Sequence, residues 1–215
     1  LKFKTELIIV HDTLEDNSIE AANNLKNEYD NIKVVHNKIG PGVKNAVQAG
    51  VDISIYNVIL ITAVDEIFPI ISIEKMLDEI VNNNKDFVSG TRYSKGGARL
   101  GGSLIGSILS KIANKMFTFL SNIPLSDCTT GIKMMKKEVW NNIKLQSNPT
   151  GWAFAFELSI KAYIQDYKIS EFPIKSVDRL FGGYSTFKLN AWIKEYLKLF
   201  IWGIKKTNII KKKNK

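Results

Sequence analysis

Acidic and basic side chains follow the ends of several strand-like segments of this sequence. In open α/β sheets, ligands bind beyond the carboxyl ends of the strands, so these side chains are the first candidates for a site. Carboxylates can bind base or ribose hydroxyls or a divalent ion, and an arginine can offset phosphate charge. Acids also form turns after strands without any further role. The candidates for a nucleoside diphosphate site are Asp12 and Asp16 after residues 6–10, Asp65 and Glu66 after residues 58–62, and Arg92 after residues 87–90.

A second group of candidates lies in the second half of the chain. Asp127 precedes Thr-Thr-Gly, so it is either a functional carboxylate or a residue that caps the local turn. Arg179 is a second candidate cation, and it can also pair with its neighbour Asp178. Glu157 lies among phenylalanines and a leucine, which indicates a buried structural partner more than a catalyst. Cys128 is expected to be a small buried residue and not a nucleophile.

The composition is that of a globular protein with one large α/β domain. The chain has 215 residues, of which 45% are hydrophobic and 24% charged, so extensive disorder is not expected. A single cysteine excludes an internal disulfide framework and suits a reducing compartment. The two histidines offer no zinc-binding spacing, and no signal peptide is evident.

Strand-like and helix-like segments alternate along the chain. Apolar β-branched runs predict strands, and apolar spacings of three and four predict the helices between them. This order predicts an α/β fold with a doubly wound, mostly parallel sheet and helices on both faces. The glycine-rich stretch 94–102 is either a lid over a substrate or an ordinary surface loop. The predicted strands are 6–10, 33–36, 58–62, 87–90 and 167–173, and the predicted helices are 18–29, 42–53, 72–82, 103–120, 154–164 and 189–204.

Residues 189–215 are expected to form an amphipathic helix and a polybasic tail, apart from a domain at 1–188. The net charge is +9, and the six lysines of residues 205–215 leave 9 − 6 = +3 for the rest. The helix is too short and too charged to span a bilayer, which takes about 20 apolar residues. It either lies in a membrane interface, anchored by Trp192, Trp202 and the tail, or packs on the protein's own sheet. The tail either binds anionic lipid or nucleic acid, or is a solvated end.

Several motifs together resemble family 2 glycosyltransferases of the dolichyl-phosphate-mannosyltransferase-like branch. The resemblance covers about residues 6–200 and is most specific in its second half. FVSGTRY is similar to the family's VxGSRY, and SDCTTGIK is similar to its SDxTxGFR. The motifs are VHDTLEDNS (10–18), GPGVKNAVQAG (40–50), FVSGTRY (87–93), LSKIAN (109–114), SDCTTGIK (126–133), FEL (156–158) and EFPIKSVDRLFGGYSTFK (171–188).

The resemblance implies a GT-A-type fold and inverting transfer of a sugar from a UDP- or GDP-sugar to an acceptor such as a polyprenyl or dolichyl phosphate. A departing diphosphate accumulates negative charge, which Mg²⁺ or Mn²⁺ and arginines can stabilise. A lipid phosphate is already ionised and needs no strong base, whereas a hydroxyl acceptor would make Asp127 the base candidate. We assign donor binding to Asp12, Asp16, Gly42 and Asp65, catalysis to Asp65, Asp127, Arg92 and Arg179, acceptor-phosphate binding to Arg99, Lys111 and Ser185, and the metal to Asp65.

Two departures from the family pattern bear on activity. The family begins one strand earlier, with a Pro-x-x-Asn-Glu motif that is absent here. Together with the initial Leu1, this predicts a fragment, or else a chain that supplies that edge of the sheet differently. The family's Asp-x-Asp metal motif aligns with Ala63-Val64-Asp65, so its first carboxylate is missing. One carboxylate and the substrate phosphates can still hold Mg²⁺, with weaker affinity.

Three hypotheses follow for the function. The first is a glycosyltransferase that works at the cytoplasmic face of a membrane, on a lipid phosphate and against an anionic surface. The second keeps the fold and nucleotide-sugar binding but loses turnover, because of Ala63 and the missing strand. The third is a basic nucleic-acid-binding protein. It is disfavoured because most of the chain is only mildly basic and lacks interleaved aromatic and basic residues.

Overall fold

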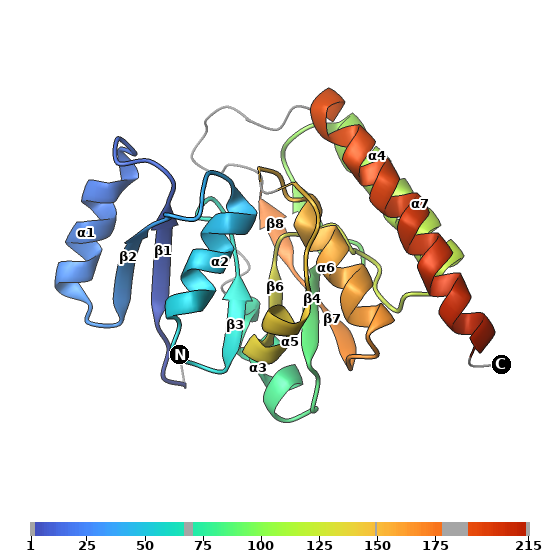
Figure 1. Cartoon of the computed structure of the whole chain (residues 1–215), viewed down its shortest axis with the longest axis horizontal. Helices are drawn as coiled ribbons and strands as arrows, with labels where there is room; N and C mark the ends of the chain where they lie inside the picture. Colours follow the sequence, from blue (N-terminus) through green and yellow to red (C-terminus); the bar gives the residue numbers. More distant parts are fainter. Residues whose placement is uncertain (1–2, 67–70, 149, 178–188, 214–215) are drawn as a thin grey trace.

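The computed structural model describes residues 3–66, 71–148, 150–177 and 189–213 (Figure 1). Within these ranges the strands form three hydrogen-bonded sheets. The first pairs β1 (Leu7–His11) with β2 (Ile32–His36), and another pairs β5 (Ala98–Leu100) with β8 (Lys175–Val177). The largest has the order β3-β6-β4-β7, with β3 (Val58–Ile61), β4 (Phe87–Thr91), β6 (Lys133–Lys136) and β7 (Ile169–Pro173).

The prediction of a mostly parallel, doubly wound α/β fold is confirmed, with one antiparallel strand. β6 runs antiparallel to both β3 and β4, whereas the β1–β2, β4–β7 and β5–β8 pairs are parallel. The helices are α1 (Ser18–Glu28), α2 (Val43–Ile53), α3 (Ile73–Val81), α4 (Leu104–Ser121), α5 (Lys137–Asn142), α6 (Ala153–Ile164) and α7 (Leu189–Lys213). The sequence did not predict β5, β6, β8 or α5.

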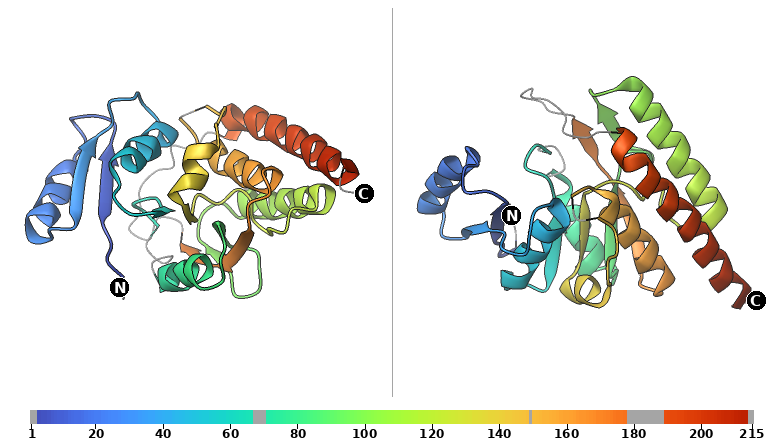
Figure 2. Two further views of the ribbon diagram at one scale, coloured as in Figure 1. Left: turned by 60° about the horizontal axis from the view of Figure 1, so that its bottom comes forward. Right: turned by 45° about the horizontal axis from the view of Figure 1, so that its top comes forward.

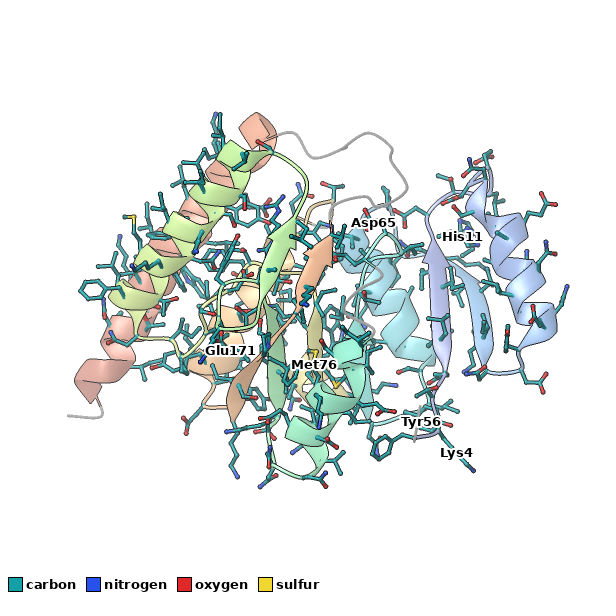
Figure 3. All side chains as sticks on the ribbon, turned by 180° about the vertical axis from the view of Figure 1, so that it is seen from behind. Lys4, His11, Tyr56, Asp65, Met76 and Glu171 are labelled. Carbon is teal, nitrogen blue, oxygen red and sulfur yellow. The ribbon has the colours of Figure 1, made fainter. Side chains whose placement is uncertain are left out.

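Alternate residues of the central strands enter two separate cores, because successive side chains of a strand point to opposite faces. Phe87 and Met135 pack into the larger core with α6 and α7, whereas Val88 and Met134 pack into the smaller core beside Met76 of α3. Figures 1 and 3 show α6 on one side of the sheet and α3 on the other. The central sheet is therefore covered by helices on both faces.

The β1–β2 pair is held to the rest of the fold partly through Glu6. Among the described residues no strand is hydrogen-bonded between β1 and β3, so the two sheets are separate there. The Glu6 carboxylate accepts from Lys33 Nζ of β2 at 2.6 Å and from the backbone N–H of Ile55 at 2.6 Å, just before β3. Burial would raise the pKa of Glu6, but these bonds hold it below its ordinary value. The bridge ties the start of β1 to the chain that enters β3.

The C-terminal helix α7 is longer than expected, and Trp202, one of its two candidate membrane anchors, packs against the protein. α7 runs to Lys213 instead of ending at Ile204. It packs against α4 and α6, and the rings of Phe117 and Phe200 are 5.2 Å apart. Trp202 packs against the larger core, with Lys161 Nζ 5.8 Å from its ring centroid. Of the two alternatives for this helix, the position of Trp202 therefore favours packing on the protein itself, because its side of α7 faces α6.

Candidate functional site

The candidate carboxylates of the N-terminal half lie at the carboxyl ends of their strands. In Figure 3, His11 at the end of β1 and Asp65 after β3 lie toward one end of the sheets, whereas Lys4 and Tyr56, which precede the same strands, lie toward the other. This is the end at which ligands bind in open α/β sheets. The residues that follow β1 and β3 therefore lie toward the same end of the molecule, and their joint role in donor binding stays a prediction.

Asp12 is held in a fixed orientation by two neighbours. Its Oδ1 accepts from Asn37 Nδ2 at 2.8 Å, and its Oδ2 accepts from the backbone N–H of Gly42 at 2.7 Å. Gly42 is the N-cap of α2 and has φ 115°, in the left-handed region that favours glycine. Asn37 also donates to the carbonyl of Gly40 at 2.6 Å. Sequence reasoning missed Asn37, which nevertheless lies only one residue beyond β2.

Asp16 makes a local hydrogen bond that explains why an acidic residue occurs at this position. Its Oδ1 accepts from the backbone N–H of Ser18, the first residue of α1, at 2.9 Å. This bond lowers the pKa of the carboxyl. Asp16 therefore caps the start of α1, and its role in donor binding stays a prediction.

Asp65 and Val64 are exposed in the turn after β3. No group of three or more potential metal-ligating side chains lies together within the described parts of the chain. Next to Asp65, Glu66 turns inward and its Oε1 accepts from Ser176 Oγ of β8 at 2.7 Å. An ion at Asp65 would therefore take one carboxylate from Asp65 and its other ligands from phosphates and water, which is how Mg²⁺ commonly binds.

Arg92 and Asp127 form a buried two-point ion pair. Arg92 Nε donates to Oδ2 at 2.7 Å and Nη2 donates to Oδ1 at 3.0 Å, while Asp127 is fully buried. The backbone N–H groups of Thr129 and Thr130 also donate to Oδ1, each at 3.2 Å. The turn-capping role and the ionic role of Asp127 therefore coexist.

The charges of this pair reinforce one another. Burial alone would raise the pKa of Asp127, but the charge and hydrogen bonds of Arg92 hold it below its ordinary value. Burial alone would lower the pKa of Arg92, but Asp127 raises it, and Glu66 adds to the effect. Both groups are ionised across the whole physiological range. A carboxylate in this state is a poor proton acceptor.

A buried lysine lies next to this pair and was not predicted from the sequence. Lys133 of β6 is fully buried, and its Nζ donates to Ser89 Oγ at 2.7 Å and to the carbonyl of Cys128 at 3.2 Å. Burial lowers the pKa of Lys133 to about 8. Burial also raises the pKa of the Cys128 thiol to about 12, which agrees with the prediction of an inert buried cysteine. Lys133 thus ties β4 to the turn that contains Asp127.

The residues proposed for the acceptor phosphate are partly outside the described ranges. Arg99 is half-buried on β5, and Lys111 is exposed on α4. Ser185 and the catalytic candidate Arg179 lie outside the residues that the structure describes. The structure therefore tests no common site for these four residues.

The glycine-rich stretch 94–102 contains a strand instead of being loop throughout. β5 pairs with β8, with Arg99 opposite Ser176. A Cβ on Gly97 would lie 2.6 Å from the carbonyl oxygen of Thr91, so this position excludes any side chain. The stretch is thus fixed by strand pairing and close packing, and a lid role stays a prediction.

Glu157 is a structural residue, as predicted. It is nearly fully buried, it accepts from the backbone N–H groups of Gln146 and Ser147, and it pairs with Lys161 at 2.6 Å. Burial would raise its pKa, but these partners hold it below its ordinary value. Glu157 therefore fixes the loop before α6.

Comparisons with known proteins agree on one family. The sequence profile of "Glycosyl transferase family 2" matches residues 2–143. A polyprenol monophosphomannose synthase of Mycolicibacterium smegmatis is 26% identical over 208 residues, which cover 94% of this chain and 77% of that protein. A dolichyl-phosphate hexose transferase of Haloferax volcanii is 30% identical over 138 residues, 62% of this chain and 56% of that protein.

The fold is also similar to a solved enzyme structure. Glucosyl-3-phosphoglycerate synthase of Mycobacterium tuberculosis, in complex with Mn²⁺, UDP and glucosyl-3-phosphoglycerate, superposes with a TM-score of 0.69 at 13% identity. The match covers 93% of this chain and 68% of that one. At this identity the likeness concerns the fold.

Proposed function

Because the chain belongs to glycosyl transferase family 2 and has a GT-A-type fold, we propose that it moves a sugar from a nucleoside diphosphate sugar to a polyprenyl phosphate, with inversion at the transferred carbon. The choice of a polyprenyl phosphate as the acceptor rests on the similarity to a polyprenol monophosphomannose synthase along 94% of the chain. That protein's name specifies a lipid monophosphate, and the motifs in the second half of this chain resemble those of the dolichyl-phosphate-mannosyltransferase-like branch.

The donor nucleotide is proposed to lie at the carboxyl ends of β1 and β3. The carboxylate of Asp12 is fixed by Asn37 and by the backbone of Gly42, so it is oriented before the ligand arrives. Each of its oxygens accepts one of these bonds and has a further lone pair for a base N–H or a ribose hydroxyl. The donor is a UDP- or GDP-sugar, since either base offers such donors.

A Mg²⁺ or Mn²⁺ ion fits this edge if the diphosphate supplies part of its ligands. Asp65 is exposed there and offers one carboxylate, in keeping with an ion that retains water and binds phosphates. When bound, the ion would offset the charge that develops on the leaving diphosphate. Arg92 contributes less directly, because its guanidinium is already paired with Asp127. Arg179 is the remaining proposed cation for the diphosphate.

Asp127 is proposed to position the site and not to remove a proton. Its low pKa and its pairing with Arg92 make it a poor base. A polyprenyl phosphate needs none, because phosphate oxygens are ionised near neutral pH. The acceptor oxygen is therefore already the nucleophile, and Arg92 and Asp127 hold the turn of residues 126–130 beside β4. Arg99, Lys111 and Ser185 remain the proposed ligands of the acceptor phosphate.

Such an acceptor places the reaction at a membrane surface, and we propose the cytoplasmic face, where nucleotide sugars and reduced cysteines occur together. Within the described residues, no helix combines the length and the apolar character needed to cross a bilayer. The proposal therefore calls for a protein that lies on the membrane, with residues 189–215 as one contact.

The test is a transfer assay with the full chain. Labelled UDP- and GDP-hexoses are incubated with polyprenyl phosphate in detergent micelles and Mn²⁺, and the lipid phase is analysed by mass spectrometry. The proposal predicts a hexosyl phosphate lipid, formed from one of the donors and not from polyprenol without phosphate. Equal labelling of polyprenol would refute the lipid-phosphate acceptor.

Nucleotide-sugar binding without transfer is the second candidate, and Ala63 in the metal motif is the observation that favours it. The two candidates differ in the same assay: a chain that binds the donor but forms no glycolipid and releases no diphosphate is a binding protein of this fold.

A further inference from the structure

The amphipathic helix α4 exposes its apolar face and turns its polar face toward the protein, the reverse of an ordinary surface helix. Eight large apolar side chains cover its outward face, and Phe119, Leu104 and Ile105 are 81%, 78% and 73% exposed. A surface helix normally turns its apolar stripe toward the core. The eight exposed residues, called here the α4 surface, are Leu104, Ile105, Ile108, Leu109, Ile112, Met116, Phe119 and Leu120.

The inward side of α4 is mainly polar and serves the candidate site. Asn114 is buried, donates to Thr129 Oγ1 at 2.9 Å and accepts from the backbone N–H of Cys128 at 2.9 Å. Ser110 Oγ accepts from the hydroxyl of Tyr93 at 2.8 Å. Phe117 is the buried aromatic residue of this side. The polar side thus holds the turn of Asp127, and the apolar side is left outside.

The neighbouring helix α7 also carries exposed apolar side chains. Figures 1 and 2 show α4 and α7 lying along each other at the outer edge of the molecule, far from β1 and β2. Ile193, Leu197 and Ile201 recur every fourth residue on α7 and are about half exposed. Large apolar side chains exposed together on two adjacent helices mark an interaction site.

The charges around the area are of one sign. α4 contains Lys111 and Lys115, both exposed, and no acid. The exposed charged residues of the described part of α7 are Lys194, Lys198, Lys205 and Lys206. The single acid of α7, Glu195, is half-buried and accepts from the backbone N–H of Asn148 at 2.6 Å. Apolar residues bordered by lysines are typical of helices that lie in the interface of an anionic membrane.

We propose that the α4 surface, with the apolar stripe of α7, lies on the anionic surface of a lipid bilayer. Self-association is disfavoured, because a second copy would set lysines against lysines, while α4 has no acid and Glu195 of α7 already binds Asn148. α4 lies flat on the bilayer, and the bonds of Asn114 then connect the membrane-facing helix to the turn of Asp127. The proposal rests on the proposed function for its purpose, since a lipid-phosphate acceptor must be reached from that surface.

The test is sedimentation of the full chain with vesicles of phosphatidylcholine alone or with phosphatidylglycerol. The variant Ile105→Ser/Phe119→Ser removes two exposed side chains of the α4 surface that contribute little to the fold. The matched control Ile55→Ser/Ile71→Ser removes two side chains of similar exposure, 69% and 70%, elsewhere in the molecule. Circular dichroism melting curves establish that both variants are folded.

The wild-type chain and the control are expected to bind vesicles that contain phosphatidylglycerol. The α4 variant should bind about tenfold less or weaker still, because interfacial binding scales with the apolar area buried. Wild-type-like binding of the α4 variant, or no binding by the wild type, overturns the proposal. Sedimentation velocity tests self-association. A wild-type dimer that becomes monomeric only in the α4 variant, together with no vesicle binding by the wild type, overturns the proposal in favour of self-association.

Nucleotide titration of the same variants separates this proposal from the proposed function. The α4 variant should bind nucleotide as the wild type does, because its substitutions lie on the outward side of α4. Vesicle binding without nucleotide binding would leave the α4 surface in place and refute the proposed function. Nucleotide binding without vesicle binding would refute the role of the α4 surface and leave the proposed function in place.

Discussion

Arg92 and Asp127 are joined by two hydrogen bonds, Nε to Oδ2 at 2.7 Å and Nη2 to Oδ1 at 3.0 Å, although they are 35 residues apart in sequence. The two-point geometry fixes the turn after α4 against the end of β4. The same two hydrogen bonds pair the charge of Arg92 with Asp127, so this arginine is less available to bind a diphosphate. The pair is better suited to hold the site in shape than to meet the diphosphate directly.

Removal of one member of this pair should strongly destabilise the fold. Arg92→Ala leaves a buried carboxylate without its partner, which costs about 3–5 kcal/mol in comparable proteins. The control Lys33→Ala breaks the more exposed pair with Glu6 and should cost about 1 kcal/mol or less. Urea unfolding of both variants measures the difference. Equal losses would contradict the assigned importance of the buried pair.

The contribution of Asp127 should depend on pH at the acidic end. Its pKa in the folded chain is lower than its ordinary value of 3.8, so its stabilising effect is complete above that value and is lost as pH falls through the lower pKa. The free energies of unfolding of the wild type and Asp127→Asn should therefore differ most near pH 7 and converge below pH 3.8. A difference that stays constant down to pH 3 would refute the ionic role.

Lys133 should make the stability depend on pH at the alkaline end, again with stability rising as pH rises. Its pKa falls from 10.5 to about 8 on folding, so the unfolded chain binds more protons between these values and stability rises with pH. Relative to Lys133→Met, the wild type should gain up to about 3 kcal/mol between pH 8 and pH 10.5, at about 1.4 kcal/mol per pH unit. Unfolding titrations across this range test the gain. Parallel curves for the two proteins would show that the lysine is not buried as described.

Gly97 should not tolerate a side chain. An added Cβ would lie 2.6 Å from the carbonyl oxygen of Thr91, so Gly97→Ala must shift the backbone beside β5 and should cost about 2 kcal/mol. Gly106 in the first turns of α4 has no such neighbour within 3.4 Å, and Gly106→Ala should be neutral or stabilise by up to about 1 kcal/mol. Melting temperatures rank the two. A stable Gly97→Ala variant would mean that the 94–102 stretch is free to move.

Local signals predicted most of the fold. The apolar runs at 6–10, 33–36, 58–62 and 87–90 all became strands, shifted by a residue or so, because each is a short β-branched run between polar turns. β6 was missed because KMMK carries charge at both ends and only its pairing between β3 and β4 makes it a strand. The three-residue strands β5 and β8 are defined by each other and have no signal of their own.

The site was predictable in its residue types and not in its contacts. Strand ends located Asp12, which directly follows β1, and Asp65, which lies in the turn after β3. The pairing of Arg92 with Asp127 and the burial of Lys133 depend on tertiary contacts between β4, β6 and the turn after α4. The same holds for α4: the periodicity gave an amphipathic helix, but only the polar partners of Asn114 decide which side faces inward.

A nucleotide and a metal ion are proposed to bind at the carboxyl ends of β1 and β3. The most direct measurement is calorimetric titration of UDP and GDP, with and without Mn²⁺, into the wild type, Asp65→Asn and Asp30→Asn. Asp30 is also an exposed acid and lies at the opposite end, just before β2. We predict Mn²⁺-dependent binding of one nucleotide, weakened about tenfold or more by Asp65→Asn through the loss of a charged ligand and unchanged by Asp30→Asn. Absence of binding by either nucleotide, or equal binding by Asp65→Asn and the wild type, would contradict the account.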